Sequence, residues 1–318
     1  MRRKLPPSPL PVRDGVCASR LYLQPGPWRT LWDFMLHRFP HVSHDVLKRR
    51  LDNGDIVDGD GRPQQAGQPY RAHQWLWYYR DVPDEVALPF DLPIIHADDV
   101  LVVVDKPHFM ATTPAGRYLR ETALVRLRRQ LGIVDLTPVH RLDRDTAGVV
   151  MFCIDPKHRG AYQRLFQERQ VDKEYEAVAP WRPGLGLPRS YCSRMVEGGG
   201  KDFRMAEIPG PPNSETRIEL IDRLADGLAH YRLMPVSGKK HQLRVHMNGL
   251  GIPIANDEMY PDLLPMRAAD DFSHPLQLLA RSIAFADPLS GLPRRFVSQR
   301  RLDMAHDVAG ASSSALPA

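Results

Sequence analysis

The sequence predicts an α+β fold whose sheet is mixed and largely antiparallel. Segments with the length and residue types of strands outnumber segments with a helical period. Two strand-like segments, residues 215–224 and 228–236, are separated only by Ala225-Asp226-Gly227, which is typical of a hairpin turn. Because a hairpin joins antiparallel neighbours, we expect antiparallel pairs to dominate the sheet.

Length and composition indicate a globular protein. The 318 residues are 42% hydrophobic, and no apolar run approaches the ~18 residues that a transmembrane helix needs. The first residues, MRRKLPPSPLP, place prolines where a signal peptide has an apolar segment, so we expect a soluble, cytoplasmic protein without membrane contact, and we take it to be a monomer. Three widely separated cysteines, Cys17, Cys153 and Cys192, exclude a disulfide framework and a thiolate zinc site. The formal net charge of +5 permits a polyanionic partner without requiring one.

The N-terminal part begins without a regular period. Residues 1–25 are rich in proline and arginine, which favours a loosely ordered, flexible arm. Helical stripes follow from Trp28 and over residues 43–51. Residues 53–61 carry turn residues around the apolar pair Ile56-Val57, which predicts short strands joined by tight turns.

This order of two helices and a hairpin resembles the small alpha-L RNA-binding domain found in several RNA-modifying enzymes. We assign residues 26–85 to a degenerate copy of that domain, because Asp55, Asp58 and Asp60 in its hairpin would repel phosphates. The proline-punctuated, acidic residues 81–93 are the expected linker.

The larger predicted domain spans residues 94–300. Its clearest helix follows Asp155-Pro156, which supplies an N-cap and a proline at the first helical position. Residues 180–214, rich in glycine and proline, favour loops with little core of their own. Residues 301–318 are the expected disordered tail. The remaining expected strands are residues 94–95, 100–104, 149–154, 171–179, 276–285 and 295–298, and the remaining expected helices are residues 121–131 and 240–250.

Motifs for nucleotide cofactors are missing from the sequence. It has no Gly-x-Gly-x-x-Gly after a strand, no phosphate loop and no Gly-x-Ser-x-Gly elbow. His37, His41 and His44 could share a helical face, but no carboxylate or cysteine stands at ligand spacing, so surface histidines are the better interpretation. We therefore expect neither a cofactor nor a metal.

Charged residues gather in the turn before the buried strand of residues 149–154. Asp143 and Asp145 would share a face on extended backbone, as do carboxylates that act together at a glycosidic bond. The neighbouring Arg141 and Arg144 would depress the pKa of an aspartate and keep it ionised, which suits a nucleophile or a base. We expect Asp145 to hydrogen-bond its own backbone and Asp143 to carry chemistry.

The same turn carries a family resemblance. The run His140-Arg141-Leu142-Asp143-Arg144-Asp145-Thr146-Ala147-Gly148 resembles the signature of the RluA-type pseudouridine synthases, which isomerise uridine to pseudouridine in structured RNA. The resemblance implies that residues 94–300 are a catalytic domain of the pseudouridine synthase type. Three further blocks agree in order and spacing, namely Val104-Asp105-Lys106-Pro107, Val171-Asp172-Lys173-Glu174-Tyr175, and Gly238-Lys239-Lys240-His241-Gln242-Leu243-Arg244-Val245-His246.

The resemblance implies roles for the matching residues of the reaction site. Asp143 matches the catalytic aspartate, and Tyr175 matches the tyrosine that stacks on the target base. Arg244 would pair with Asp143, and Leu243 would line the pocket. Asp143 would either attack the sugar or remove a sugar proton, and the redox-neutral reaction would need no cofactor.

The resemblance also implies a set of RNA-binding residues. Arg141 matches the arginine that fills the gap left by the extruded nucleotide, and Lys173 would support the charge of the pocket. Arg144 and His140 complete the expected set.

Three positions depart from the family pattern. Lys239-Lys240 replaces the usual Arg-Thr before His241, Pro107-His108-Phe109-Met110 departs from Pro-x-Gly, and Asn256-Asp257 stands where Gly-Asp is usual. None of these departures replaces Asp143.

From these residues we predict an RNA pseudouridine synthase that isomerises uridines by base flipping, with structured RNA as its partner and ribosomal RNA preferred. One alternative is a synthase directed at transfer RNA. Another is a catalytically silent RNA-binding or assembly factor of the same fold. A third is a hydrolytic glycosidase that uses Asp143 and Asp145 and releases free base.

Overall fold

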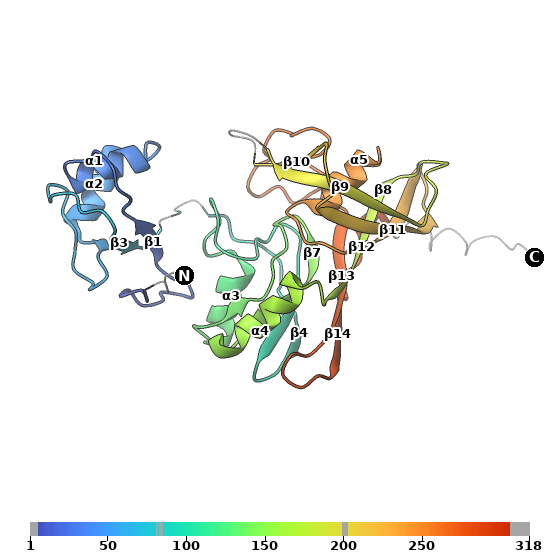
Figure 1. Ribbon diagram of the computed structural model, residues 1–318, viewed down its shortest axis with the longest axis horizontal. Helices are drawn as coiled ribbons and strands as arrows, with labels where there is room; N and C mark the ends of the chain where they lie inside the picture. Colours follow the sequence, from blue (N-terminus) through green and yellow to red (C-terminus); the bar gives the residue numbers. More distant parts are fainter. Residues whose placement is uncertain (1–5, 81, 83–84, 199–202, 306–318) are drawn as a thin grey trace, which may run out of the picture. The chain divides into compact units, whose positions relative to one another are not determined.

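The computed structural model of the chain forms two compact units, each described separately below (Figure 1). The first unit is Met1–Glu85 with Gly116–Arg120 and Leu127–Val134, and the second is Val86–Ala115, Glu121–Arg126 and Asp135–Ala318. The structure describes residues 6–80, 82, 85–198 and 203–305. The expected disordered tail therefore lies outside the described residues from position 306 onward.

The first unit contains two helices and a small sheet. Thr30 and Asp33 form a capping box at the start of the first helix, and the Ser43 side chain caps the second. Phe34 and Leu47 bury the apolar faces of these helices against the sheet. The elements are β1 (Ser19–Tyr22), α1 (Leu31–Arg38), α2 (His44–Asp52), β2 (Ile56–Val57) and β3 (Trp75–Tyr78), with strand order β1-β3-β2.

One expectation for this unit was wrong. The arm predicted for residues 1–25 includes a strand, β1, because Leu21 and Leu23 supply apolar side chains to the core. The turn-rich residues 53–61 contain one short strand, β2, which lies between turns and pairs with β3. That the unit is an alpha-L-like RNA-binding domain stays a prediction.

The second unit is organised around an eleven-stranded sheet. The strand order is β10-β9-β11-β12-β8-β13-β7-β5-β4, and β14 pairs with β13 and β6 with β7. The parallel pair of β13 and β7 makes the sheet mixed, and the other pairings in its described part are antiparallel. The expected α+β class with a largely antiparallel sheet is thus confirmed. The strands are β4 (Ile94–Ala97), β5 (Leu101–Lys106), β6 (Thr137–Pro138), β7 (Ala147–Cys153), β8 (Asp172–Pro180), β9 (Arg189–Glu197), β10 (Met205–Ile208), β11 (Ser214–Arg223), β12 (Leu228–Pro235), β13 (Leu278–Ala286) and β14 (Pro293–Val297).

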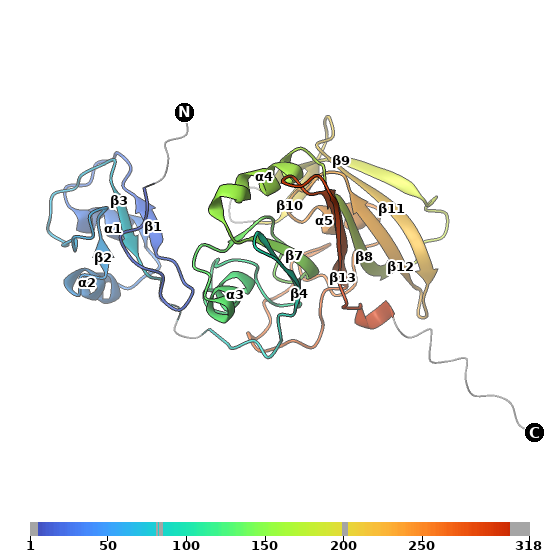
Figure 2. The same cartoon turned by 90° about the horizontal axis from the view of Figure 1, so that it is seen from below.

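The helices of this unit pack against different parts of the sheet. In α4 (Pro156–Gln167) the Asp155 side chain accepts from the N–H of Lys157 at 2.9 Å, so the predicted N-cap is confirmed. That helix packs on β7, whereas α5 (Gln242–Gly249) packs against β9, β10, β11 and β12 (Figure 1 and Figure 2). The short 3-10 helix η1 (Asp303–Ala305) also belongs to this unit, whereas α3 (Ala123–Leu131) is divided between the two units, with its residues from Leu127 onward in the first. Within the described residues no helix has the length and apolar character needed to cross a membrane.

The loops expected over residues 180–214 were wrong. The structure contains β9 and β10 there, and both join the sheet beyond β11. Polar and apolar residues are mixed in these strands, and Met195 and Met205 are buried with Val245 and Tyr260. Tertiary packing therefore decides a strand that local composition did not indicate.

A row of paired residues across four strands brings together three of the sequence blocks that resemble the family pattern. The register sets Tyr175 of β8 opposite Ala280 of β13, Ala280 opposite Gly148 of β7, and Gly148 opposite Lys106 of β5. Gly148 has φ +114°, and a Cβ there would lie 2.2 Å from the carbonyl oxygen of Ala280. Glycine is therefore needed at position 148 for β13 to approach β7. Gly148 stands five residues after Asp143, so this close approach lies next to the turn that carries Asp143.

Candidate active site

Asp143 lies in the turn that leads into β7, and its neighbours fix this turn. The N–H of Thr146 donates to the carbonyl of Asp143 (3.3 Å). The hydroxyl of Thr112, in the loop after β5, donates to the carbonyl of Leu142 (2.7 Å) and accepts from the N–H of Leu142 (3.1 Å). Thr112 therefore holds the main chain directly beside Asp143.

Replacing Thr112 with valine is expected to lower the free energy of unfolding by about 1–3 kcal/mol, because both buried main-chain groups of Leu142 lose their partner. Urea denaturation of the two proteins measures this difference. Thr113→Val makes the same chemical change one residue later, where the structure records no side-chain hydrogen bond, and should leave the midpoint nearly unchanged. Equal midpoints for all three proteins would contradict the role given to Thr112.

Two more side chains, one from the last residue of β5 and one from the loop after it, hold the carbonyls of the turn. Buried Lys106 donates to three carbonyl oxygens, one of which belongs to Arg144 (3.3 Å). His108 Nδ1 donates to the carbonyl of Asp145 (2.7 Å). Burial lowers the pKa of Lys106 to about 7, although the negative charges of Asp145 and Asp143 oppose this shift. The turn thus receives three side-chain anchors from the end of β5 and the loop that follows it.

Arg244 of α5 faces Asp143 and is itself held by a buried carboxylate. Its Nε and Nη2 donate to the two oxygens of Asp257, at 2.8 and 2.5 Å. The remaining nitrogen, Nη1, lies 3.9 Å from Asp143 Oδ2 and has no hydrogen-bond partner among the described residues. The Arg244 side chain is 2% exposed and that of Asp257 is fully buried. Asp257 therefore fixes the guanidinium with one nitrogen directed at Asp143.

His241 approaches the same oxygen of Asp143. Its Nε2 lies 3.9 Å from Asp143 Oδ2, and its Nδ1 lies 3.0 Å from the hydroxyl of Tyr260. His241 directly precedes α5 and has a φ of +54°, in the left-handed region. Burial, together with the positive charges of Arg244 and Lys240, lowers the pKa of His241 to about 3. The imidazole is therefore neutral at physiological pH.

The pKa of Asp143 is raised, which corrects the depressed pKa expected from the neighbouring arginines. Burial of the carboxyl group is the largest cause, and the charge of Asp145 adds to it. Arg244 and Lys106 act in the opposite direction but do not prevail, since neither makes a hydrogen bond to Asp143. The side chain is 36% exposed, so the carboxylate is crowded by protein atoms on one side and open on the other.

Tyr175 and Leu243 form the apolar side of the site. Tyr175 packs partly buried against the hydrophobic cluster that contains Leu243, which is 7% exposed. Burial and the negative charge of Asp143 raise the pKa of Tyr175, so its hydroxyl stays protonated. The structure thus brings four of the predicted residues, Asp143, Tyr175, Arg244 and Leu243, to one site.

A buried polar network holds α5 in place beneath these residues. His246 contacts the hydroxyls of Ser193 (3.2 Å), Ser214 (2.9 Å) and Thr216 (2.9 Å), and Gln242 donates to Thr216 (3.0 Å). These partners lie on β9 and β11. The network explains how a helix with little regular period keeps Arg244 directed at Asp143.

The predicted RNA-binding residues are placed differently from one another. Arg141 is exposed beside Asp143, and Lys173 donates to a carbonyl of the loop before α5, at Ser237 (3.1 Å). The ring of His140 stacks on that of Phe166, with 4.7 Å between the ring centres, and accepts a hydrogen bond from the N–H of Met151. Both contacts stabilise the fold. The roles of these residues toward RNA stay predictions.

Arg144 and Asp145 pair with each other. Arg144 Nη1 donates to Asp145 Oδ1 at 2.7 Å, and the guanidinium lies 5.3 Å from the ring centre of Phe109. The expectation that the Asp145 side chain binds its own backbone was wrong, because within the described residues its recorded hydrogen bond goes to Arg144. The adjacent arginine competes successfully for the carboxylate.

Two of the departures from the family pattern share a backbone feature. Phe109 and Asn256 stand where glycine is usual, and both have left-handed φ values, +63° and +61°. Asparagine tolerates this conformation, and its side chain also donates to the carbonyl of Pro275 (3.0 Å). Phe109 is strained there but packs its ring near those of Phe90 (6.2 Å) and Phe272 (5.4 Å). The turn geometry is kept although the glycine is lost.

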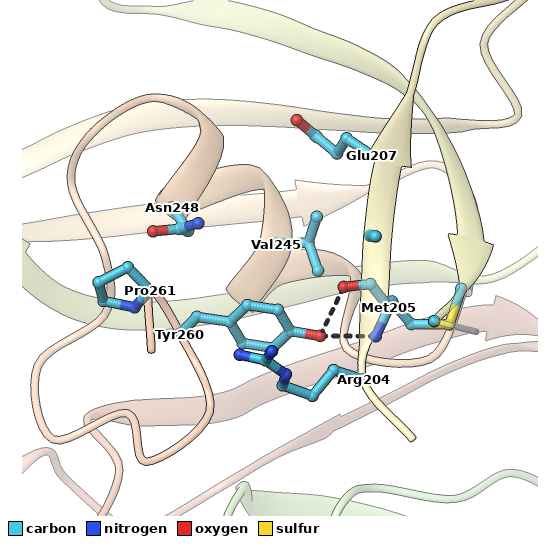
Figure 3. Close-up of a pocket in the computed structure, with 9 residues that line it drawn as sticks. Arg204, Met205, Glu207, Val245, Asn248, Tyr260 and Pro261 are labelled. Carbon is cyan, nitrogen blue, oxygen red and sulfur yellow. Dashed lines mark hydrogen bonds between the residues drawn. The ribbon is translucent and has the colours of Figure 1, made fainter. Parts of the chain in front are cut away.

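A pocket of about 280 Å³ lies between β10 and α5, beside this site (Figure 3). Met205 and Glu207 line it from β10, Val245 and Asn248 from α5. Tyr260 also lines the pocket and hydrogen-bonds His241, so one side chain connects the pocket wall with the Asp143 site.

Several residues of the site were not foreseen in their roles, namely Thr112, His108, Asp257 and Tyr260. Each acts through a contact between distant parts of the chain, and no local pattern marks it. For Asp257 the sequence did contain one signal, since Asn256-Asp257 stands where the family pattern usually has Gly-Asp. Among residues 6–80, 82, 85–198 and 203–305, no group of three or more His, Cys, Asp or Glu side chains is placed to hold a metal ion.

Comparison with known proteins gives consistent matches. A model of the family described as RNA pseudouridylate synthase matches residues 100–249. The dual-specificity RNA pseudouridine synthase RluA of Escherichia coli is 32% identical over 176 residues, which cover 53% of this chain and 77% of that protein. The mitochondrial tRNA pseudouridine(32) synthase of Saccharomyces cerevisiae is 29% identical over 243 residues, which cover 73% of this chain and 51% of that protein.

A solved structure agrees with the fold. Human RNA pseudouridylate synthase domain containing 4 aligns with a TM-score of 0.53 and 26% identity, over 67% of this chain and 90% of that structure. The match to the family model, over residues 100–249, includes the turn with Asp143.

Proposed function

The chain belongs to the RluA-type RNA pseudouridine synthases, and on that premise we propose that it isomerises specific uridines of ribosomal RNA with Asp143 as the catalytic residue. As a member of this family it is an isomerase. The observation that carries the assignment of Asp143 is its placement, because buried Arg244 and His241 both face one oxygen of this carboxylate while the side chain stays partly open.

The proposed reaction requires the target base to leave its stack. Flipping a nucleotide costs a few kcal/mol, and an aromatic ring that stacks on the base contributes ~1–3 kcal/mol in return. Tyr175 is proposed to supply that ring, because it lies near enough for the charge of Asp143 to raise its pKa, and its protonated hydroxyl adds no negative charge. Exposed Arg141 is proposed to occupy the gap in the RNA.

The chemistry falls to Asp143. The bond from C1′ to N1 breaks, a bond from C1′ to C5 forms, and the hydrogen on C5 is replaced by one on N1. A carboxylate with a raised pKa is a stronger base and nucleophile than an ordinary aspartate, which suits attack on the sugar and removal of a sugar proton alike. Arg244, which cannot lose its proton, limits the repulsion between Asp143 and the phosphates.

The preference for ribosomal RNA rests on the first unit, proposed here to be an RNA-binding domain. Exposed Lys48 and Arg49 lie on α2. The acidic turn is partly neutralised, because Asp58 accepts from the N–H groups of Asp60 and Arg62, both at 2.9 Å, and Asp60 pairs with Arg62. Transfer RNA stays the alternative, since the similar yeast protein is named as a tRNA synthase.

Release of tritium tests this proposal. Ribosomal and transfer RNA transcripts labelled with tritium on C5 of uridine are incubated separately with the protein, because formation of the C1′–C5 bond displaces the label. Release from ribosomal RNA at mapped sites is the expected result. Release from transfer RNA alone would overturn the ribosomal assignment, and no release from either RNA would contradict pseudouridine formation.

A further inference from the structure

The hydroxyl of Tyr260 has three hydrogen-bond partners, which together fix its proton. The N–H of Met205 lies at 2.8 Å, the carbonyl of Met205 at 3.0 Å, and Nδ1 of His241 at 3.0 Å (Figure 3 shows the two contacts with Met205). Met205 belongs to β10, the edge strand of the sheet, and within the described residues no further strand pairs with its outer edge. The hydroxyl oxygen of Tyr260 instead binds both main-chain groups of Met205, as a neighbouring strand would do.

Only one arrangement of hydrogen atoms satisfies all three contacts of the Tyr260 hydroxyl. A hydroxyl has one hydrogen and two acceptor lone pairs. The N–H of Met205 can only donate and its carbonyl can only accept, so the hydrogen of Tyr260 goes to that carbonyl. The remaining lone pair must accept from His241, which therefore carries its proton on Nδ1. Nε2 of His241 is left with a bare lone pair, 3.9 Å from Asp143 Oδ2.

We infer that Tyr260 and His241 are positioning residues that keep Asp143 reactive by directing a lone pair, and not a hydrogen-bond donor, at its Oδ2. This inference rests on the proposed catalytic role of Asp143. Oδ2 already faces one donor, Nη1 of Arg244 at 3.9 Å. A second donor would stabilise the anion further, whereas a lone pair at Nε2 of His241 leaves the carboxylate more basic. When Asp143 takes up a proton, Nε2 is available to accept a hydrogen bond from it.

Several charged groups surround Asp143 and His241, and they set the pKa of each group. The tautomer of His241 is the property that can still change. Arg244, Lys106 and Lys240 lower the pKa of Asp143, and Asp145 raises it together with burial. Tyr175 faces Asp143 from β8 with a protonated hydroxyl.

Around His241, Arg244 and Lys240 lower the pKa while Asp257 and Asp145 raise it, and with burial the pKa lies at about 3. The imidazole therefore remains neutral where activity is measured, and only the nitrogen that bears its proton can change.

The substitution Tyr260→Phe tests the inference through the pH profile. Without the hydroxyl, Nδ1 loses its acceptor, and the ring can place its proton on Nε2 and donate to Asp143. The acid limb of kcat/KM is then expected to move to lower pH by roughly one unit, and kcat at pH 7 is expected to fall. Tyr191→Phe is the matched control, because that hydroxyl donates to Glu207 (3.1 Å) and not to His241. An acid limb that stays in place, or moves to higher pH, in Tyr260→Phe would overturn the inference.

Nitrogen NMR of the wild-type protein tests the tautomer without any dependence on activity. With ¹⁵N-labelled histidine, the signal of His241 is assigned by its loss in His241→Asn, a substitution that tolerates the left-handed backbone. A protonated Nδ1 and an unprotonated Nε2 are expected. A protonated Nε2 would overturn the inference even in an active enzyme. Correct protonation in a protein that is inactive on every RNA would instead contradict the proposed function.

Discussion

Asp257→Asn is expected to lower the free energy of unfolding by about 3–5 kcal/mol and to reduce pseudouridine formation below detection. The Arg244 guanidinium is 2% exposed and would lose the only buried carboxylate to which it donates in the described structure. Asparagine keeps the size of the side chain but replaces one acceptor oxygen with a donor, which then faces an N–H of Arg244. The main-chain N–H groups of Met259 and Tyr260 also bind Asp257, so the segment that carries Tyr260 loosens as well.

Urea denaturation and tritium release measure the two effects. Asp262→Asn is the matched control, because Asp262 is exposed five residues later and should change neither quantity. The double variant Arg244→Met/Asp257→Asn removes the uncompensated charge, so it should regain part of the lost stability while remaining inactive. A single Asp257→Asn variant with the wild-type midpoint would contradict the role given to this pair.

The elements with a strong local pattern could be predicted from the sequence. The apolar run that became β7 is buried along its whole length, and the Asp155-Pro156 cap does begin α4. The hairpin of β11 and β12 followed from Ala225-Asp226-Gly227. In these places burial, capping and turn chemistry all act within a few residues, so the sequence alone contains the information.

The strands β9 and β10 could not be predicted in this way. β9 has polar residues on both faces and β10 has only four residues, and the apolar contacts of both come from distant positions such as Val245 and Tyr260. A strand of this kind is decided by its neighbours in the sheet.

The candidate site also contains residues that the sequence could predict and residues that it could not. Asp143, Tyr175 and Arg244 were found because they stand in recognisable blocks. Their support was not, since the hydrogen bonds of Thr112 and Tyr260 join residues that are 30 and 55 positions apart. The sign of the pKa shift of Asp143 also required the structure, because burial outweighs the nearby positive charges.

Asp143→Asn is expected to abolish activity without loss of stability. An amide neither attacks C1′ nor takes up a sugar proton, so the rate should fall by at least roughly 10³-fold. The pKa of Asp143 is raised in the folded protein, so folding favours its protonated form. Stability from this group is therefore lost as the pH rises from the ordinary value of 3.8 through the raised pKa. At neutral pH the neutral asparagine avoids that cost, and the variant should unfold at the same or a higher urea concentration.

The most direct measurement compares Asp143→Asn with Asp145→Asn. The two carboxylates lie two residues apart in one turn, but Asp145 is paired with Arg144 and Asp143 faces Arg244 and His241. Tritium release from RNA labelled on C5 of uridine should be lost in Asp143→Asn and largely kept in Asp145→Asn, with both variants folded. Equal release from wild type and Asp143→Asn would contradict the assignment of Asp143 as the catalytic residue.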